Sequence, residues 1–376
     1  MVIELSEKKH IAIYVNSLKK NGTERVVSNL LEFLVGRGHR ITLVTTYRKE
    51  SEFPLNPAVN RIMSEINTDE ITSSRIRNFC RRFMKLRRIW QSEKPDVILS
   101  FIGLNNIMTV ITSRFLKNRV VVAVRGTPYI EYPDKLTKFA ARHLFRFADT
   151  VLLQTEAGRG FFPPAVRRKA VVVKNLANPC FFRPRFTGER EKTIVAATRI
   201  HESKNHRMLI LAFAKIAEKF PEYELYIYGE GELRESLTEE VKHLGLSDRI
   251  HLPGHAQRLE ETLWRAGIYV MCSNTEGVPN TLIEAMLLGL CCISTDFPYG
   301  GAAALITHGE NGLLTPTYDV DKMAGHLEYL IENPDVAEKL GQAAHRLQAT
   351  YDPQTVGEDW ERLIMGDHPK RRGEQQ

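Results

Sequence analysis

The feature of this sequence that most limits its fold is a repeated alternation of short apolar runs with longer amphipathic segments. In the first half, the apolar runs span residues 11–15, 41–45, 97–100, 120–124, 151–154 and 171–173. The segment after the first run carries, at helical spacing, Val26, Val27, Leu30, Leu31 and Leu34. Continuous apolar runs are typical of strands buried on both faces, and the intervals between them leave room for crossover helices. The pattern predicts an α/β fold with a parallel sheet.

The same alternation restarts in the second half, from an apolar run at 193–197 to one at 291–295. Between the halves, the segment NPCFFRPRFTGERE is rich in Pro, Gly and charge, as domain boundaries often are. A chain of 376 residues also exceeds what one hydrophobic core usually organises. We predict two Rossmann-like, doubly wound domains, 1–187 and 188–352, facing across a cleft, followed at 353–376 by a C-terminal helix and disordered tail.

Charge is distributed unevenly between the predicted domains. Residues 1–187 contain 33 Lys and Arg against 15 Asp and Glu, a net charge of +18, whereas the whole chain carries +7. A basic half favours an anionic partner, but no nucleic-acid recognition motif accompanies it, so we expect no nucleic-acid partner. The first residues lack an apolar signal-peptide stretch, and no run of about 18 apolar residues occurs. We therefore expect a cytoplasmic protein without a membrane span.

A predicted helix at 71–90 concentrates the positive charge. It has seven Lys and Arg, no acidic residue, and an apolar stripe at helical spacing made of Ile76, Phe79, Phe83, Leu86 and Trp90. Basic amphipathic helices are typical of membrane-surface elements, with roughly 1 kcal/mol per cation near anionic lipid. The pattern equally fits a helix that lays its stripe on the N-terminal sheet and exposes its basic face to water. The sequence leaves both interpretations open.

Two cations follow the first strand of the second domain. Arg199 and Lys204 lie five residues apart, just after the run at 193–197. Such a pair can hold a diphosphate, Arg through two parallel hydrogen bonds and Lys as a point charge. The alternative is a pair of solvated loop cations, which are ordinary on protein surfaces.

The segment TEGVPNTLIEAMLLG places two glutamates around the start of a predicted helix. Glu276 lies in the preceding loop, and Glu284 is expected in the first turn, where Thr281 and Glu284 have the spacing of a capping box. Capping explains Glu284 without a ligand but leaves Glu276 unexplained. Backbone N–H groups at a helix start suit a phosphate. The loop expected to contact the phosphate consists of Gly277, Val278, Pro279, Asn280 and Thr281.

The sequence gives little indication of a metal site. Asp319 and Asp321 have the spacing of some metal-binding carboxylate pairs, but acids are also expected at the start of a helix. The histidines show no spacing typical of zinc, and the five cysteines are interpreted as reduced core residues. We therefore expect no metal and no bound cofactor. The loop NSLKKNG contains Gly22, a single glycine that by itself is weak support for a phosphate-binding turn.

Four segments together resemble the family 4 retaining glycosyltransferases, which have the two-Rossmann GT-B fold. The segments are NGTERVVSNLLEFLVGRGHRITLVT, ATRIHESKNHRMLILAF, LYIYGEGELRESLTEEVKHLGLSDRIHLPGH, and EGVPNTLIEAMLLGLCCISTD followed by GENGLLTP. The resemblance extends to about residue 350. Its most specific element is the pair of glutamates separated by seven residues, in combination with the Arg and Lys pair.

The resemblance implies a nucleotide-sugar site in the C-terminal domain and an acceptor site in the N-terminal domain. It implies that Arg199 and Lys204 hold the diphosphate, that Glu276 contacts hydroxyls of the donor sugar, and that Glu284 contacts the ribose. The remaining implied donor contacts are the loop from Gly277 to Thr281, the loop at Gly22, and the backbone near Gly254 and His255. Family members retain the anomeric configuration, need no metal as a rule, and use a donor phosphate oxygen to take the acceptor proton.

The chain departs from the family pattern at several positions. Thr198 stands where a glycine commonly precedes the arginine, and Asn21 replaces the first of two loop glycines. Arg125 occupies a position near the sugar where many members have a histidine, and where a subgroup acting on polyprenyl-linked oligosaccharides has an arginine. Ala302 and Ala303 lie in a loop where a glutamate is frequent in the family.

These features predict transfer of a hexose or N-acetylhexosamine from a nucleotide sugar, expected to be UDP-linked, to a lipid-linked or glycan acceptor in polysaccharide or O-antigen-type biosynthesis. Lys204, Arg199, Glu276 and Arg125 are the expected catalytic residues. Peripheral association of the N-terminal domain with the anionic inner face of the membrane is expected. The alternatives are a UDP-sugar epimerase and a catalytically silent sugar-nucleotide-binding module, which the retained charged residues argue against.

Overall fold

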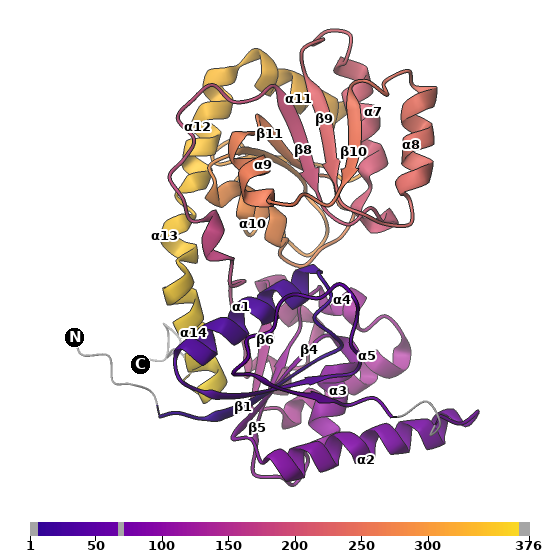
Figure 1. The fold of residues 1–376 in the computed structure, drawn as a ribbon, viewed down its shortest axis with the longest axis vertical. Coiled ribbons are helices and arrows are strands. Elements are labelled where there is room, and N and C mark those ends of the chain that lie inside the picture. The colour runs from indigo at the N-terminus through magenta and orange to yellow at the C-terminus, as the bar shows by residue number, and fades with distance from the viewer. Residues whose placement is uncertain (1–6, 67–70, 368–376) are drawn as a thin grey trace, which may run out of the picture. The chain divides into compact units, whose positions relative to one another are not determined.

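The computed structural model describes residues 7–66 and 71–367. The chain divides into two compact units. The N-terminal unit runs to Leu176 and includes the segment from Pro353 onward, and the C-terminal unit is Ala177–Asp352. Each unit is built on its own parallel sheet with helices on both faces (Figure 1). The predicted doubly wound α/β class is confirmed for both halves of the chain.

The described part of the N-terminal unit has a seven-stranded sheet in the order β3-β2-β1-β4-β5-β6-β7. Its strands are β1 His10–Val15, β2 Arg40–Thr45, β3 Asn60–Met63, β4 Val97–Phe101, β5 Arg119–Ala123, β6 Thr150–Leu153 and β7 Ala170–Val172. Its helices are α1 Gly22–Gly36, α2 Arg75–Glu93, α3 Gly103–Thr112, α4 Pro128–Glu131, α5 Lys135–Leu144, α6 Pro164–Arg167 and α14 Pro353–Met365, with 3-10 turns at Phe145–Phe147 and Glu156–Phe161.

Both faces of this sheet are buried, as its continuous apolar runs predict. In β1, Ile11 and Ile13 face a cluster that includes α1 and α14, whereas Ala12 and Tyr14 face a cluster that includes α2. Successive residues of a strand point to opposite faces, so a strand covered on both sides must be apolar throughout. The carboxyl ends of the strands remain uncovered by this packing and are the natural place for a ligand.

The C-terminal unit repeats the design with a six-stranded sheet, again counted over described residues, in the order β10-β9-β8-β11-β12-β13. Its strands are β8 Thr193–Ala197, β9 Glu224–Tyr228, β10 Ile250–Gly254, β11 Ile268–Met271, β12 Cys291–Thr295 and β13 Leu313–Thr315. Its helices are α7 His206–Ile216, α8 Arg234–His243, α9 Leu259–Arg265, α10 Asn280–Leu287, α11 Val320–Glu332, α12 Pro334–His345 and α13 Gln348–Tyr351, with 3-10 turns at Pro179–Phe181 and η5, Glu202–Lys204.

The first boundary lies after Leu176 rather than at the expected 187/188, whereas the second coincides with the expected 352/353. The segment 177–187 belongs to the C-terminal unit, because Ala177 and Phe181 are buried in its core. Helix α14 belongs to the N-terminal unit, where Trp360 stacks on Phe101 with ring centroids 5.9 Å apart and donates from Nε1 to the carbonyl of Lys174. In Figure 1, α14 lies beside α1. The tail predicted to be disordered from residue 368 onward lies outside the described residues.

Helix α2 combines the two interpretations that its sequence allows. Its last turns are anchored, with Leu86, Ile89 and Trp90 buried against the sheet. Its first turns are not, because Ile76 is 77% and Phe79 is 45% exposed. The apolar stripe therefore covers the sheet only in its C-terminal half, and its N-terminal half faces solvent.

Candidate active site

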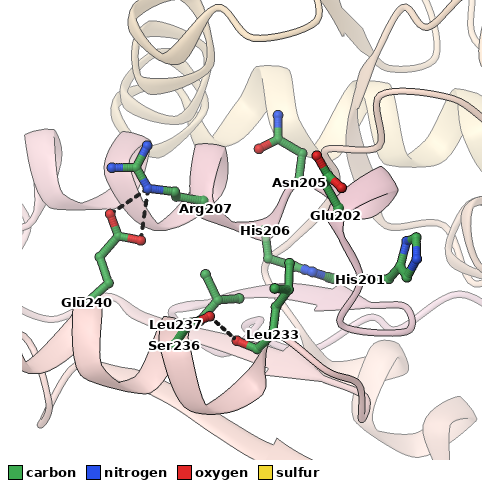
Figure 2. A pocket seen from close by; sticks show the side chains of 9 residues that line it. All are labelled: His201, Glu202, Asn205, His206, Arg207, Leu233, Ser236, Leu237 and Glu240. Atoms are coloured by element: carbon green, nitrogen blue, oxygen red, sulfur yellow. Dashed lines mark hydrogen bonds and ion pairs between the residues drawn. The ribbon is translucent and has the colours of Figure 1, made fainter.

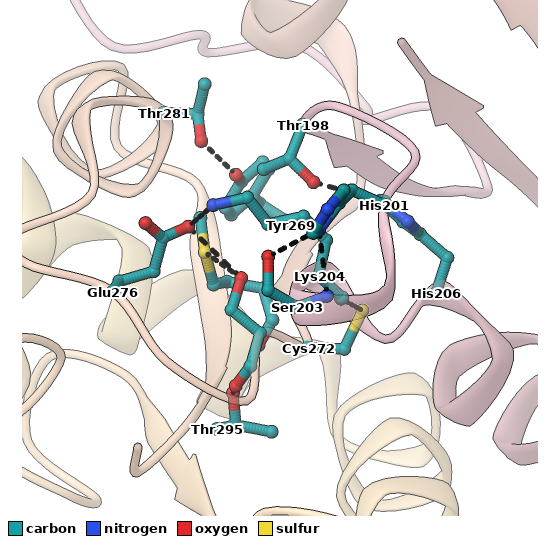
Figure 3. A network of polar contacts seen from close by, with 12 residues as sticks. Thr198, His201, Ser203, Lys204, His206, Tyr269, Cys272, Glu276, Thr281 and Thr295 are labelled. Carbon is teal, nitrogen blue, oxygen red and sulfur yellow. Dashed lines mark hydrogen bonds and ion pairs between the residues drawn. The ribbon is translucent and has the colours of Figure 1, made fainter. Parts of the chain in front are cut away.

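Lys204 and Glu276 form an ion pair where two neighbouring strands of the C-terminal sheet end (Figure 3). Lys204 closes η5, which follows β8, and Glu276 lies in the loop after β11. Strands β8 and β11 are adjacent and parallel, so both loops leave the sheet at its carboxyl edge, where doubly wound sheets bind ligands. The two side chains are 18% and 19% exposed, which leaves the pair open to a ligand.

A set of hydrogen bonds joins the two loops that carry this ion pair. The Ser273 hydroxyl donates to Glu276 Oε1 at 3.2 Å. The backbone N–H of Asn274 donates to the carbonyl of Ser203 at 2.8 Å, and the side-chain amide of Asn205 donates to Asn274 Oδ1 at 2.9 Å. Asn205 adopts the left-handed conformation, with φ of 47°, between η5 and α7. The Lys204 and Glu276 backbones are therefore fixed relative to each other before any ligand binds.

Arg199 lies on the same loop as Lys204 but in a different environment. It is exposed, and its guanidinium makes no hydrogen bond or ion pair with any residue in the described ranges. A cation fixed in a pair and a free guanidinium thus stand on one loop at the carboxyl edge. Together they can meet an anion with more than one negative charge.

His206 supports this loop through a hydrogen bond with Thr198. It opens α7, is 2% exposed, and its Nε2 lies 2.9 Å from the Thr198 hydroxyl. Burial, with a smaller contribution from the Lys204 charge, lowers the pKa of His206 to about 4. The imidazole is therefore neutral near pH 7 and adds no charge to the site. Thr198, which stands where the family commonly has glycine, thus has a defined structural partner.

Helix α10 begins in a different register from the one its sequence suggests. It starts at Asn280 with Pro279 before it, and no side chain caps it. Thr281 lies inside the helix and accepts a hydrogen bond from the Tyr269 hydroxyl at 2.8 Å, so the expected capping box is wrong. Glu284 is the fifth residue of α10 rather than a first-turn residue, and it is 1% exposed. Capping therefore does not explain why a glutamate is buried there.

The predicted base-binding backbone lies at the end of β10. Gly254 closes this strand with φ of +86°, a conformation that favours glycine, and its carbonyl accepts from the N–H of Gly229 at 2.8 Å. A Cβ at Gly254 would lie 2.7 Å from a Glu230 carboxylate oxygen. His255 follows and is exposed. This backbone belongs to the same carboxyl edge as Lys204, two strands away in the sheet order.

A pocket of about 320 Å³ lies next to η5 but outside the predicted donor residues (Figure 2). It contains two carboxylates, Glu202 and Glu240, and the second is paired with Arg207 at 2.7 Å. Carboxylates in the lining disfavour a diphosphate. The residues lining it are His201, Glu202, Asn205, His206, Arg207, Leu233, Ser236, Leu237 and Glu240.

The Asp319 and Asp321 pair has structural roles. Asp319 caps α11 by accepting from the N–H of Lys322 at 2.8 Å, and Asp321 pairs with Lys215 at 2.8 Å. In residues 7–66 and 71–367, no group of three or more His, Cys, Asp or Glu side chains is arranged to hold a metal ion.

Two predicted site residues belong to the N-terminal unit. Gly22 is the first residue of α1, next to Asn21, at the carboxyl end of β1 and its loop. Arg125 follows β5 and is 6% exposed, with its Nη2 donating to Asn175 Oδ1 and its guanidinium 5.4 Å from the centre of the Trp360 ring. Gln154 also donates to Asn175 Oδ1, at 2.9 Å. The structure therefore brings Lys204, Glu276 and Arg199 to one sheet edge and holds Gly22 and Arg125 at the corresponding edge of the other sheet.

Family models match both halves of the chain. The model described as "Glycosyl transferase 4-like domain" matches residues 21–175, and the model described as "Glycosyl transferases group 1" matches residues 181–347. Together they span most of each unit, without β1 and α14. The chain belongs to the group 1 glycosyltransferases. Membership of family 4 within this group implies transfer with retention of the anomeric configuration.

Relatives and solved structures agree with this assignment. A Campylobacter jejuni protein named "GalNAc-alpha-(1->4)-GalNAc-alpha-(1->3)-diNAcBac-PP-undecaprenol alpha-1,4-N-acetyl-D-galactosaminyltransferase" is 26% identical over 359 residues, covering 94% of this chain and 98% of its own. Sucrose-phosphate synthase from Thermosynechococcus elongatus superposes with a TM-score of 0.81 at 17% identity, covering 95% and 98%. Anabaena HepE in complex with UDP gives a TM-score of 0.79 at 16% identity, covering 95% and 99%. These two structures support the GT-B fold.

The glycosyltransferase also depends on glycines that the sequence analysis did not single out. A Cβ at Gly229 or Gly231 would lie 2.1 Å from the carbonyl oxygen of Thr198 or 1.9 Å from that of Ile200. A Cβ at Gly301 would lie 1.8 Å from the carbonyl oxygen of Gly277. The loop after β9 thus supports the backbone around Arg199. The loop after β12 supports the backbone of Gly277, next to Glu276. The glycines at 229 and 231 form a visible G-x-G in the sequence, but only the fold shows what they touch.

Proposed function

We propose that this glycosyltransferase moves a hexose or N-acetylhexosamine from a UDP-sugar to a lipid-linked acceptor during assembly of a polysaccharide or O-antigen-type glycan. The observation that carries the donor half of this proposal is the Lys204–Glu276 ion pair, together with the exposed Arg199 on the same loop as Lys204. These groups combine two cations for a diphosphate with a carboxylate for sugar hydroxyls at one sheet edge.

The chemistry follows from these groups. The bond between the sugar C1 and the diphosphate breaks while the acceptor oxygen forms its bond to C1 on the same face. Negative charge grows on the diphosphate, and Lys204 and Arg199 stabilise it more in the transition state than in the bound donor. The acceptor proton passes to an oxygen of the departing phosphate, so no protein base is required. Glu276 accepts hydrogen bonds from donor hydroxyls, and the loop from Gly277 to Thr281, at the start of α10, contacts the phosphates.

The proposed acceptor rests on two observations: the similarity of this chain to a Campylobacter jejuni relative, and the position of Arg125. The Campylobacter jejuni relative, which matches almost end to end, is named for a saccharide carried on undecaprenol through a diphosphate. Arg125 stands at the carboxyl edge of the N-terminal sheet and is held there by Asn175 and Trp360. Guanidinium groups bind phosphate oxygens and sugar hydroxyls readily. Both features favour a lipid-linked saccharide over a free sugar.

A lipid-linked acceptor requires contact with a membrane surface, and we assign this contact to the first turns of α2 at the cytoplasmic face. No described helix is long and apolar enough to cross a membrane. Ile76 and Phe79 are exposed on a helix that carries Arg75, Arg77 and Arg81. Exposed apolar side chains beside cations are suited to the headgroup region of anionic lipid.

The membrane contact is tested by co-sedimentation with vesicles of phosphatidylcholine and phosphatidylglycerol. Replacing both Ile76 and Phe79 by Ser should reduce binding severalfold without lowering the unfolding temperature, because both residues are already exposed. Tyr329→Ser, at an exposed tyrosine of the C-terminal unit, is the matched control and should bind like the wild type. Equal binding by all three proteins would contradict this assignment.

The activity is tested by supplying UDP-sugars with a polyprenyl diphosphate saccharide and following the lengthened lipid-linked product. Transfer that is lost in Lys204→Ala and Glu276→Ala supports the proposal. Donor hydrolysis and transfer that are unaffected by both substitutions would contradict the catalytic assignment. Donor binding without turnover, for every acceptor offered, would favour the catalytically silent module instead.

A further inference from the structure

One carboxylate in the N-terminal unit holds two loops at the carboxyl edge of the sheet. Glu131, the last residue of α4, accepts from the backbone N–H of Gly103 through Oε1 at 2.6 Å. Its Oε2 accepts from the backbone N–H groups of Arg125 and Gly126, both at 3.0 Å. Gly103 follows β4 and the other two residues follow β5. A single side chain therefore binds three amides from the ends of two adjacent strands.

The β4 loop that Glu131 holds has an unusual backbone. Ile102 has φ of 70° and ψ of 127°, a conformation that a β-branched residue adopts only under constraint. Ile102 is also the N-cap residue of α3 and has no side-chain group to satisfy the first amides of that helix. Glu131 supplies the missing acceptor at Gly103, and its negative charge lies at the positive end of the helix. The strained loop is thus held from outside by a residue that is distant in sequence.

The β5 loop that Glu131 holds carries Arg125. The backbone of Arg125 is bound by Glu131, whereas its guanidinium is bound by Asn175, so the residue is fixed at both ends. Asn175 is itself 2% exposed and accepts a second hydrogen bond from Gln154. Loss of the hydrogen bond from the Arg125 backbone to Glu131 would leave the guanidinium bound to Asn175. The loop that orients Arg125 would, however, be free to move.

We propose that Glu131 is a positioning residue for the acceptor step, which sets the geometry of the β4 and β5 loops around Arg125 without touching either substrate. This inference rests on the proposed function, in which Arg125 meets the lipid-linked acceptor. A carboxylate suits the task because it only accepts hydrogen bonds. A glutamine in its place has one acceptor oxygen, and its amide group would face an N–H donor on one of the two loops.

The test is steady-state kinetics of Glu131→Gln with the lipid-linked acceptor varied at saturating donor, alongside donor hydrolysis in the absence of acceptor. An amide left without its acceptor predicts a KM for the acceptor raised about tenfold or more, with donor hydrolysis within about twofold of the wild type. Asp134→Asn is the matched control. Asp134 lies three residues further on and caps α5 through Leu136 and Thr137, so its loss should leave the acceptor KM unchanged.

A double substitution separates positioning from simple loss of stability. If Glu131 acts through Arg125, then Glu131→Gln should add little to the effect of Arg125→Ala on the acceptor KM, because the guanidinium that the loop positions is already absent. Should Glu131→Gln fold poorly, Glu131→Asp keeps the charge with a shorter reach and should give an intermediate acceptor KM.

Three results would overturn the inference: an unchanged acceptor KM in both Glu131 variants, equal losses in hydrolysis and transfer, or additive effects with Arg125→Ala. A wild-type enzyme that hydrolyses the donor but glycosylates no lipid-linked acceptor would instead contradict the proposed function itself, and the role of Glu131 with it.

Discussion

Arg199 and Lys204 share one loop, but only Lys204 has a partner in the described structure. Because Arg199 is exposed and unpaired there, Arg199→Ala should change the free energy of unfolding by less than about 0.5 kcal/mol. Its kcat should fall by about 10²- to 10³-fold, the loss typical of removing one group that stabilises transition-state charge. The measurement is donor hydrolysis and transfer at saturating substrates.

Arg207→Ala is the control for this prediction. Arg207 is exposed at the start of α7, pairs with Glu240, and lies outside the donor loops. Its replacement should leave kcat close to that of the wild type. Equal kcat values for the two arginine variants would show that Arg199 is an ordinary surface cation.

His206 should make the C-terminal unit less stable in acid. Its pKa of about 4 in the folded unit lies below the ordinary value of 6.5, so the unfolded chain takes up a proton in this window that the folded unit does not. Stability is therefore lost as the pH falls from 6.5 towards 4. Between about pH 7.5 and pH 5, the loss attributable to His206 should be about 2 kcal/mol.

Urea unfolding of the wild type and His206→Asn at the two pH values checks this account. The variant should lose less stability than the wild type over the same interval. His326, whose pKa is also lowered to about 4 by burial, remains in both proteins and contributes equally. The same pH dependence in both proteins would contradict the assignment to His206.

The supporting loops of the donor site can be tested at the level of elements. Gly301→Ala forces a Cβ against the carbonyl oxygen of Gly277, so the loop that carries Glu276 must shift. Donor binding should weaken by about tenfold or more, equivalent to roughly 1.4 kcal/mol.

Gly325→Ala is the control, because it lies in α11 with nothing within 4 Å of the added Cβ. It should stabilise the protein by about 0.5–1 kcal/mol and leave the donor Kd unchanged. Equal donor affinity in both variants would contradict the support role.

Most elements of the fold were predictable because the signal is local. Each buried strand is a continuous apolar run, and the helical face of α1 contains Val26, Leu30 and Leu34, all of which are buried. The short edge strand β3 was missed because its residues are exposed or half-buried and show no apolar run. The burial of α2 could be predicted only in part, since Phe79 and Trp90 share one stripe but only Trp90 meets the sheet.

The donor-site residues were predictable as types but not in their contacts. Lys204 and Glu276 are separated by 72 residues, and their pairing follows from the adjacency of β8 and β11. The capping box failed because α10 starts one residue before Thr281, which then meets Tyr269. Glu131 escaped notice because one of its amide partners, Gly103, is 28 residues away and reaches it only through the adjacency of β4 and β5. The spacing of residues within one segment carries no information about contacts between segments that are far apart in the sequence.

At the scale of the whole molecule, α14 returns the end of the chain to the N-terminal unit. Trp360 is fully buried there, beside Phe101 and Arg125. Trp360→Ala should therefore destabilise the N-terminal unit by about 3–5 kcal/mol and weaken acceptor use, while donor binding in the C-terminal unit persists. Trp264→Ala, at a partly buried tryptophan of the C-terminal unit, is the control and should destabilise that unit instead. Two-step urea unfolding with nucleotide added checks both, and the reverse pattern would contradict the assignment of α14.

We infer that the carboxyl edge of the C-terminal sheet is a nucleotide-sugar site built on Lys204. Calorimetric titration with UDP, GDP, ADP and their common sugar conjugates, on the wild type and on Lys204→Ala, tests it most directly. We expect the wild type to bind UDP or a UDP-sugar with micromolar affinity, and Lys204→Ala to bind it at least about tenfold more weakly. Binding of no nucleotide, or equal affinity in the two proteins, would contradict it.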